Sequence, residues 1–173
     1  MIPGPIAYHQ PTDSIVTVNA AFEVEGYRYS QLASSTAGKV EHEGEGGLVH
    51  AKKVKMDWSL NIGEMAQQIL CCPYMRSHGG QKKKSIVVLG EHTLFVLDDH
   101  GVLRQQKRME YQPVRMCSFP LDPTNPSSPH NLMVLTSTGS YMIYGEEFHL
   151  HWAATCDNTP ISMQVGSFGG MNG

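Results

Sequence analysis

Residues 85–103 read Ser-Ile-Val-Val-Leu-Gly-Glu-His-Thr-Leu-Phe-Val-Leu-Asp-Asp-His-Gly-Val-Leu, and this stretch decides the fold. Two runs within it, 85–89 and 93–98, are rich in β-branched and apolar residues and have the length of short strands. The Asp-Asp-His-Gly sequence at 98–101 has the composition of a tight turn, and apolar residues follow it. The stretch therefore predicts consecutive antiparallel hairpins.

The same pattern recurs 47 positions further along the chain. Residues 132–136 and 141–144 are again strand-like, and a Thr138-Gly139 turn joins them. The residues that fall in register at this shift are Val87 with Val134, Leu94 with Tyr141, Val96 with Ile143, Leu103 with Leu150, Pro113 with Pro160, and Ile69 with Met116 and Met163. Trp58 and Trp152 stand two such periods apart.

A repeat of roughly 40 to 50 residues that holds about four strands is typical of a β-propeller blade. One four-stranded sheet cannot bury both of its faces, so blades stack on one another. The sequence predicts an all-β fold: a partial β-propeller of about three four-stranded antiparallel blades, plus the start of a fourth. We place the blades at about 2–60, 61–109 and 110–155, and the next one begins at 160–173.

The segments between the predicted strands are polar and rich in turn-forming residues. Residues 34–51 are expected to form a mobile loop between the third and fourth strands of the first blade. Residues 73–84 and 121–130 occupy matching places in the next two blades, where each joins the innermost strand to its neighbour. Helical periodicity is almost absent; its best stretch, 63–70, is equally apolar at strand spacing.

Propeller rings close with four to eight blades, so three blades leave unpaired faces. We therefore expect the chain to be a fragment of a larger propeller. A small three-blade solenoid is the alternative.

Composition and charge narrow the classes of function. The formal net charge of −3 and the isoelectric point near 6.3 disfavour nucleic acid as a partner. Apolar runs such as 86–89 are too short to span a bilayer, and residues 1–5 do not resemble a signal peptide. The four cysteines form no C-x-x-C pair, and the Asn125 sequon is blocked by Pro126. Reduced thiols in the cytoplasm fit these features.

Histidines are the first candidate ligands. His149 and His151 lie two apart on a predicted strand and could bind a metal together, but no third ligand is apparent nearby. The alternative is a solvated strand face beside Trp152. The other histidines are scattered without ligand spacing, and solvent exposure is the simpler expectation for them: His9, His42, His50, His78, His92, His100 and His130.

Catalytic signatures are absent from the sequence. Cys71 and Cys117 fall at nearly equivalent blade positions, which indicates packing in the core more than a nucleophile. A propeller hydrolase would carry acidic or histidine side chains on the innermost strands, around 66–71, 113–118 and 160–165. Those segments hold Gln67, Gln68, Arg115 and Gln164 but no Asp, Glu or His. The sequence therefore predicts no catalytic, cofactor-binding or metal-ligating residue and no enzymatic activity.

Two further stretches have weak binding signals. The glycine-rich sequence at 166–170 lacks the following helix that a phosphate site requires, so a turn is the better interpretation. The basic cluster Lys82-Lys83-Lys84 could contact acidic headgroups, and a solvated loop beside an apolar strand explains it equally well.

Several stretches resemble one known family. They are Ile2-Pro3-Gly4-Pro5-Ile6-Ala7-Tyr8, Thr12-Asp13-Ser14 with Thr17-Val18, Glu25-Gly26-Tyr27-Arg28-Tyr29-Ser30-Gln31-Leu32-Ala33, Asp57-Trp58-Ser59-Leu60-Asn61-Ile62-Gly63-Glu64, Val87-Val88-Leu89-Gly90-Glu91 and Trp152-Ala153-Ala154-Thr155. In this order they are similar to the N-terminal propeller of the Bardet–Biedl syndrome protein nine family, also called the parathyroid-hormone-responsive B1 family. Residues 25–33 resemble the third strand of the first blade, and the segment at 57–64 is the most specific of the matches.

This resemblance implies a non-catalytic scaffold segment of a subunit of the BBSome, the adaptor complex that moves membrane proteins into and out of cilia. Other BBSome subunits would be direct partners, ciliary membrane-protein cargo indirect ones, and the membrane a peripheral contact. The implied locations are the cytoplasm, the cilium with its basal body and centriolar region, and the peripheral ciliary membrane. The alternatives are an unrelated peptide-binding propeller, whose Gly-His and Trp-Asp marks are missing here, or a propeller hydrolase.

Overall fold

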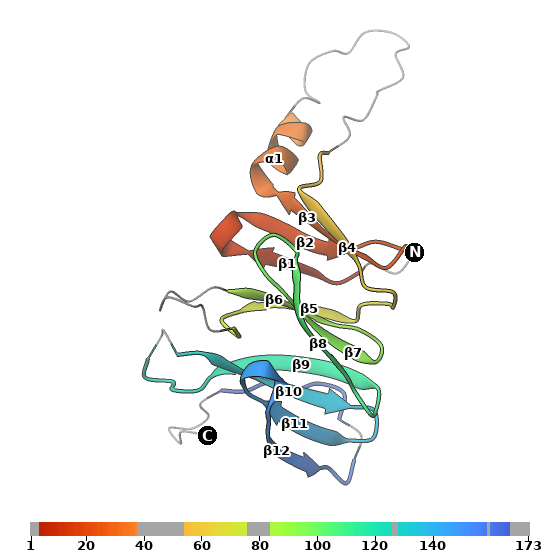
Figure 1. Cartoon of the computed structure of the whole chain (residues 1–173), viewed down its shortest axis with the longest axis vertical. Coiled ribbons are helices and arrows are strands. Elements are labelled where there is room, and N and C mark those ends of the chain that lie inside the picture. The colour runs from red at the N-terminus through yellow and green to blue at the C-terminus, as the bar shows by residue number, and fades with distance from the viewer. Residues whose placement is uncertain (1–3, 38–53, 76–83, 126–127, 159, 167–173) are drawn as a thin grey trace.

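The fold of the chain is three stacked antiparallel sheets of four strands each, as seen in a computed structural model (Figure 1). The structure describes residues 4–37, 54–75, 84–125, 128–158 and 160–166. Within each sheet the strands follow one another in chain order, so every sheet is a simple meander. The predicted all-β fold with three four-stranded sheets is confirmed.

The first sheet pairs β1 (Ile6–His9), β2 (Ser14–Val18), β3 (Glu23–Arg28) and β4 (Trp58–Asn61). A short 3-10 turn, η1 (Gln10–Thr12), links β1 to β2. The second sheet contains β5 (Gln68–Cys72), β6 (Ser85–Leu89), β7 (Thr93–Leu97) and β8 (Leu103–Arg108). The third contains β9 (Pro113–Pro120), β10 (His130–Thr136), β11 (Ser140–Tyr144) and β12 (Leu150–Thr155), with the 3-10 turn η2 (Glu146–Phe148) before β12.

One helix interrupts this pattern and was not predicted. Helix α1 (Tyr29–Ala37) follows β3 directly and projects away from the stack (Figure 1). The prediction of a loop over 34–51 is therefore wrong for residues 34–37, and residues 38–53 lie outside the described part of the chain. The expectation that 25–33 forms a strand is also wrong beyond Arg28, where β3 ends. Conversely, residues 63–70 contain no helix, and β5 begins within them at Gln68.

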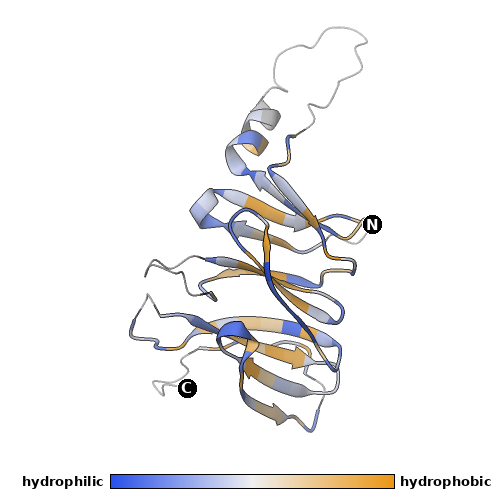
Figure 2. Cartoon of the chain, in the orientation of Figure 1, coloured by the Kyte–Doolittle hydropathy of each residue, from blue (hydrophilic) through white to orange (hydrophobic). Residues whose placement is uncertain are grey.

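The core lies in the two spaces between sheets, because the second sheet is covered on both faces. Between the first and second sheets pack side chains that are almost fully buried, among them Val16, Val24, Ile86, Val88 and Leu97. Between the second and third sheets lies a separate cluster that includes Leu89, Leu94, Val96, Leu132 and Val134. Strands β6 and β7 therefore show almost continuous burial, and hydrophobic residues concentrate on the strands (Figure 2). This is the pattern of a strand buried on both faces.

The first strands of the three sheets lie side by side: β1 contacts β5, and β5 contacts β9. The Gln68 side chain joins two of them, because its amide nitrogen donates to the Met116 carbonyl at 2.9 Å and its amide oxygen accepts from the Met116 N–H at 2.9 Å. The Gln68 side chain thus makes the pair of hydrogen bonds that a backbone residue of a neighbouring strand would make, and it joins two separate sheets. After β12, residues 160–166 form no strand.

Candidate functional site

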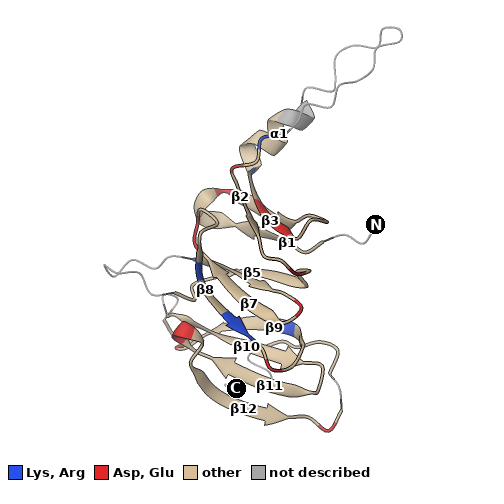
Figure 3. Cartoon of the chain, turned by 45° about the vertical axis from the view of Figure 1, so that its right-hand side comes forward, with Lys and Arg blue, Asp and Glu red and all other residues tan. Residues whose placement is uncertain are grey.

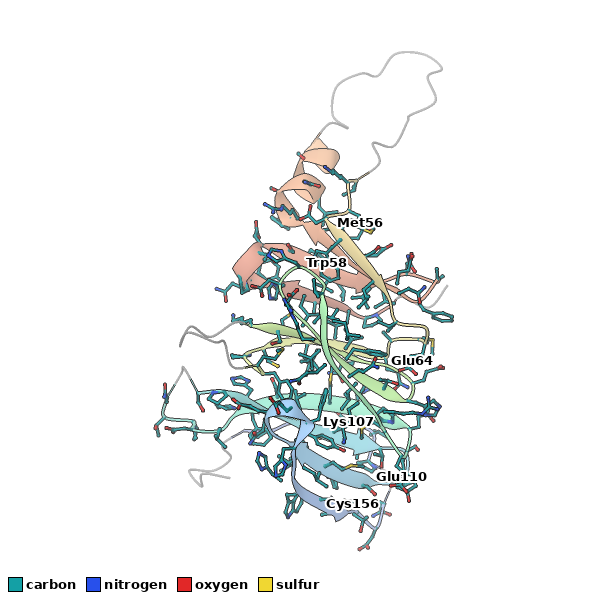
Figure 4. The ribbon with its side chains drawn as sticks, in the orientation of Figure 1. Met56, Trp58, Glu64, Lys107, Glu110 and Cys156 are labelled. Atoms are coloured by element: carbon teal, nitrogen blue, oxygen red, sulfur yellow. The ribbon has the colours of Figure 1, made fainter. Side chains whose placement is uncertain are left out.

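Residues 57–64, the most specific stretch of the sequence, join the first sheet to the second. The Trp58 indole lies between Gly26 and Gly101, where an added Cβ would come within 2.3 Å and 2.1 Å of the ring, respectively. The Glu64 carboxylate covers Gly90 of the second sheet in the same manner, and its Oε2 accepts from the His92 N–H at 3.3 Å. Figure 4 shows Trp58 and Glu64 at the boundary between the two sheets. The motif therefore has a structural role in fixing blade on blade.

A pocket of about 300 Å³ opens beside this junction. Its walls carry charges of both signs, because Arg28 and Asp57 form an ion pair at 2.8 Å and Lys55 and Asp99 lie nearby. Its remaining lining residues are Thr12, Ser14, Met56, Trp58 and His100. The balanced charge gives no preference for an anionic or a cationic ligand, and the sequence offered no signal for this pocket.

Next to this pocket, His9 is buried completely, which contradicts the expectation of solvent exposure. Its Nδ1 lies 2.8 Å from Thr12 Oγ1, its Nε2 lies 3.4 Å from the Lys84 carbonyl, and Asp99 Oδ1 is 3.5 Å away. His9 therefore links the first sheet to the second through backbone and side-chain contacts. His42, His50 and His78 lie outside the described residues.

The innermost strands are where a propeller hydrolase would hold its catalytic groups. In the structure the Gln68 side-chain amide is hydrogen-bonded to the Met116 backbone, and the Arg115 guanidinium donates to the Val114 carbonyl at 2.9 Å. No acidic or histidine side chain stands on the described parts of β5 and β9. Cysteine is the one remaining side chain on these two strands that could exchange a proton, and β1, the corresponding strand of the first sheet, ends with His9, whose side chain is completely buried.

All four cysteines are free thiols. Burial raises the pKa of Cys71 to about 11 and that of Cys72 to about 12, and burial also raises the pKa of Cys117. A nucleophilic cysteine needs the opposite shift, toward the thiolate. Cys71, Cys72 and Cys117 therefore have the environment of packing residues. Cys156 is exposed, directly after β12.

The two candidate metal ligands, His149 and His151, lie close together but not on the same strand. The His149 and His151 rings lie edge to face with their centroids 5.3 Å apart, but β12 begins at Leu150, so His149 lies in the turn and not on the predicted strand. Together with His130 and Glu146 they line a pocket of about 240 Å³. The His151 ring is packed on Gly145, where an added Cβ would lie 1.9 Å from its Nε2. Across the described ranges no three His, Cys, Asp or Glu side chains are placed to hold a metal ion.

The turn that presents these histidines has an unusual backbone. Glu147 and Phe148 both have positive φ, 55° and 56°, a region that non-glycine residues avoid. Tyr74, from the loop after β5, holds this turn: its hydroxyl donates to the Gly145 carbonyl and accepts from the Phe148 N–H at 3.1 Å. The Phe148 ring packs against Tyr74 and Tyr144, with centroids 5.6 Å and 6.3 Å away. The second and third sheets are joined here, and Lys107 over the Tyr144 ring joins them again (Figure 4).

The other two stretches with binding signals, the basic cluster and the glycine-rich sequence, are described only in part. In the basic cluster, Lys84 Nζ contacts Gln10 Oε1, whereas Lys82 and Lys83 lie outside the described residues. The glycine-rich stretch lies outside them too, from 167 onward. No helix in the described ranges has the length and apolar character to cross a membrane.

The fold and the contacts between sheets define a class: a stack of β-propeller blades joined by packing contacts. Solved structures share this fold. The N-terminal propeller BBS1N, crystallised in complex with ARL6DN and soaked with mercury, superposes with a TM-score of 0.66 at 11% identity, over 99% of this chain and 42% of that one. The WD40 domain of Neurospora crassa Pan2 gives a TM-score of 0.59 at 11% identity, over 92% and 40%.

The family is shown by sequence. The family model described as PTHB1 N-terminal matches residues 1–173, and the chain belongs to this family. Protein PTHB1 of Xenopus laevis is 35% identical over 174 residues, and Protein PTHB1 of Homo sapiens is 32% identical over 174 residues. Both alignments cover 100% of this chain and 19% of the relative, so the chain spans about a fifth of their length. The resemblance identified from the sequence is confirmed.

Proposed function

We propose that this chain is a non-catalytic scaffold segment of a BBSome subunit, which supports trafficking of membrane proteins to and from cilia, and ciliogenesis, through contacts with other proteins. The observation that carries the proposal is the family match over all 173 residues. We assign one blade to each sheet, with the limits predicted above. The packed boundaries between sheets support a rigid platform, because both spaces are filled by buried apolar side chains.

The architecture also supports a scaffold over a propeller hydrolase. On β5 and β9 the acidic and histidine groups that such an enzyme would use are absent, His9 at the end of β1 is completely buried, and burial raises the pKa of the Cys71 and Cys72 thiols. BBS1N, a propeller of the same fold, is known in complex with ARL6DN, which supports protein partners as the ligands of this fold. We propose other BBSome subunits as direct partners and ciliary cargo as indirect partners. The proposed locations are the cytoplasm, the cilium with its basal body and centriolar region, and the peripheral ciliary membrane.

Affinity purification from ciliated cells tests this function. A tagged protein containing this chain is expected to co-purify with other BBSome subunits at low ionic strength and to concentrate at the ciliary base. The matched control is the same protein with residues 4–166 replaced by an unrelated propeller segment, which should lose both. Purification without those subunits, together with a uniform cytoplasmic distribution, would overturn the proposal.

A further inference from the structure

We draw no further inference here: the strongest candidate, the pocket of about 300 Å³ at the junction of the first and second sheets, is lined by acidic and basic residues whose charges balance (Figure 3), and nothing in the structure shows what would occupy it.

Discussion

Replacing Gly101 with alanine is expected to destabilise the chain much more than the same change at Gly63. Both glycines have positive φ, 75° and 73°, so both variants incur backbone strain of about 1–2 kcal/mol. At Gly101 the new Cβ would also lie 2.1 Å from Trp58 Cε3, whereas at Gly63 nothing lies within 4 Å. Overpacking adds about 1–3 kcal/mol to the loss at Gly101. Urea unfolding monitored by circular dichroism measures the difference.

A double variant separates the two causes of this loss. In a Trp58→Ala background the indole is gone, so Gly101→Ala should cost only the strain that Gly63→Ala costs. This result would show that packing of Trp58 on Gly101 holds the first two blades together. Equal losses for the two glycine variants in the unmodified chain would show that Trp58 does not pack on the β7–β8 turn.

Leu94→Ala is the second change with a large expected effect. Leu94 is fully buried between the second and third sheets, within the cluster that also holds Leu89, Val96, Leu132 and Val134. Removing its side chain leaves a cavity between two sheets that cannot close without moving a whole blade, and such losses are typically about 2–5 kcal/mol. Chemical unfolding measures this loss in the free energy of unfolding. Leu121→Ala, at a site that is 60% exposed, is the control and should change stability by less than about 0.5 kcal/mol.

Such a result would locate the stability of the chain in the spaces between blades. If Leu94→Ala lowered the free energy of unfolding as little as Leu121→Ala does, the side chains between the second and third sheets would not be packed as described. A scaffold function depends on this packing, because a platform whose blades shift cannot present a fixed outer surface.

Much of the fold could be predicted because each strand has a local signal. The runs 85–89 and 93–98 are apolar, β-branched and bounded by turns, and the structure places β6 and β7 there. The recurrence of the same pattern 47 residues later predicted β10 and β11 in the same way. Strand formation here is dictated by residues close in sequence, and stacking follows from the two apolar faces.

The missed features depend on residues far apart in sequence. Helix α1 has no apolar stripe, since Tyr-Ser-Gln-Leu-Ala-Ser-Ser-Thr-Ala is mostly small and polar, so its sequence resembles that of a loop. His9 is buried by contacts that include Lys84, just before β6, and Asp99, just after β7, both far from it in sequence. The positive φ of Glu147 and Phe148 has no local signature, and the contact that holds it comes from Tyr74, more than 70 residues away.

The environments of the candidate site residues could be predicted only in part. Equivalent repeat positions indicated packing for Cys71, and in the structure Cys71 packs against the buried cluster between the first and second sheets. The spacing of His149 and His151 predicted their proximity but not the intervening start of β12 or the packing of His151 on Gly145.

Hydrogen–deuterium exchange tests the central claim, a rigid middle blade sealed between two others, most directly. The account predicts that amides of β6 and β7 exchange slowest, at the rate set by global unfolding, because every residue of β6 is buried and only Thr93 of β7 is partly exposed. Amides of β12 should exchange faster, since that strand is exposed and paired on one side in the described structure. Exchange of β6 and β7 as fast as that of β12 would contradict the stacked-blade architecture and the scaffold built on it.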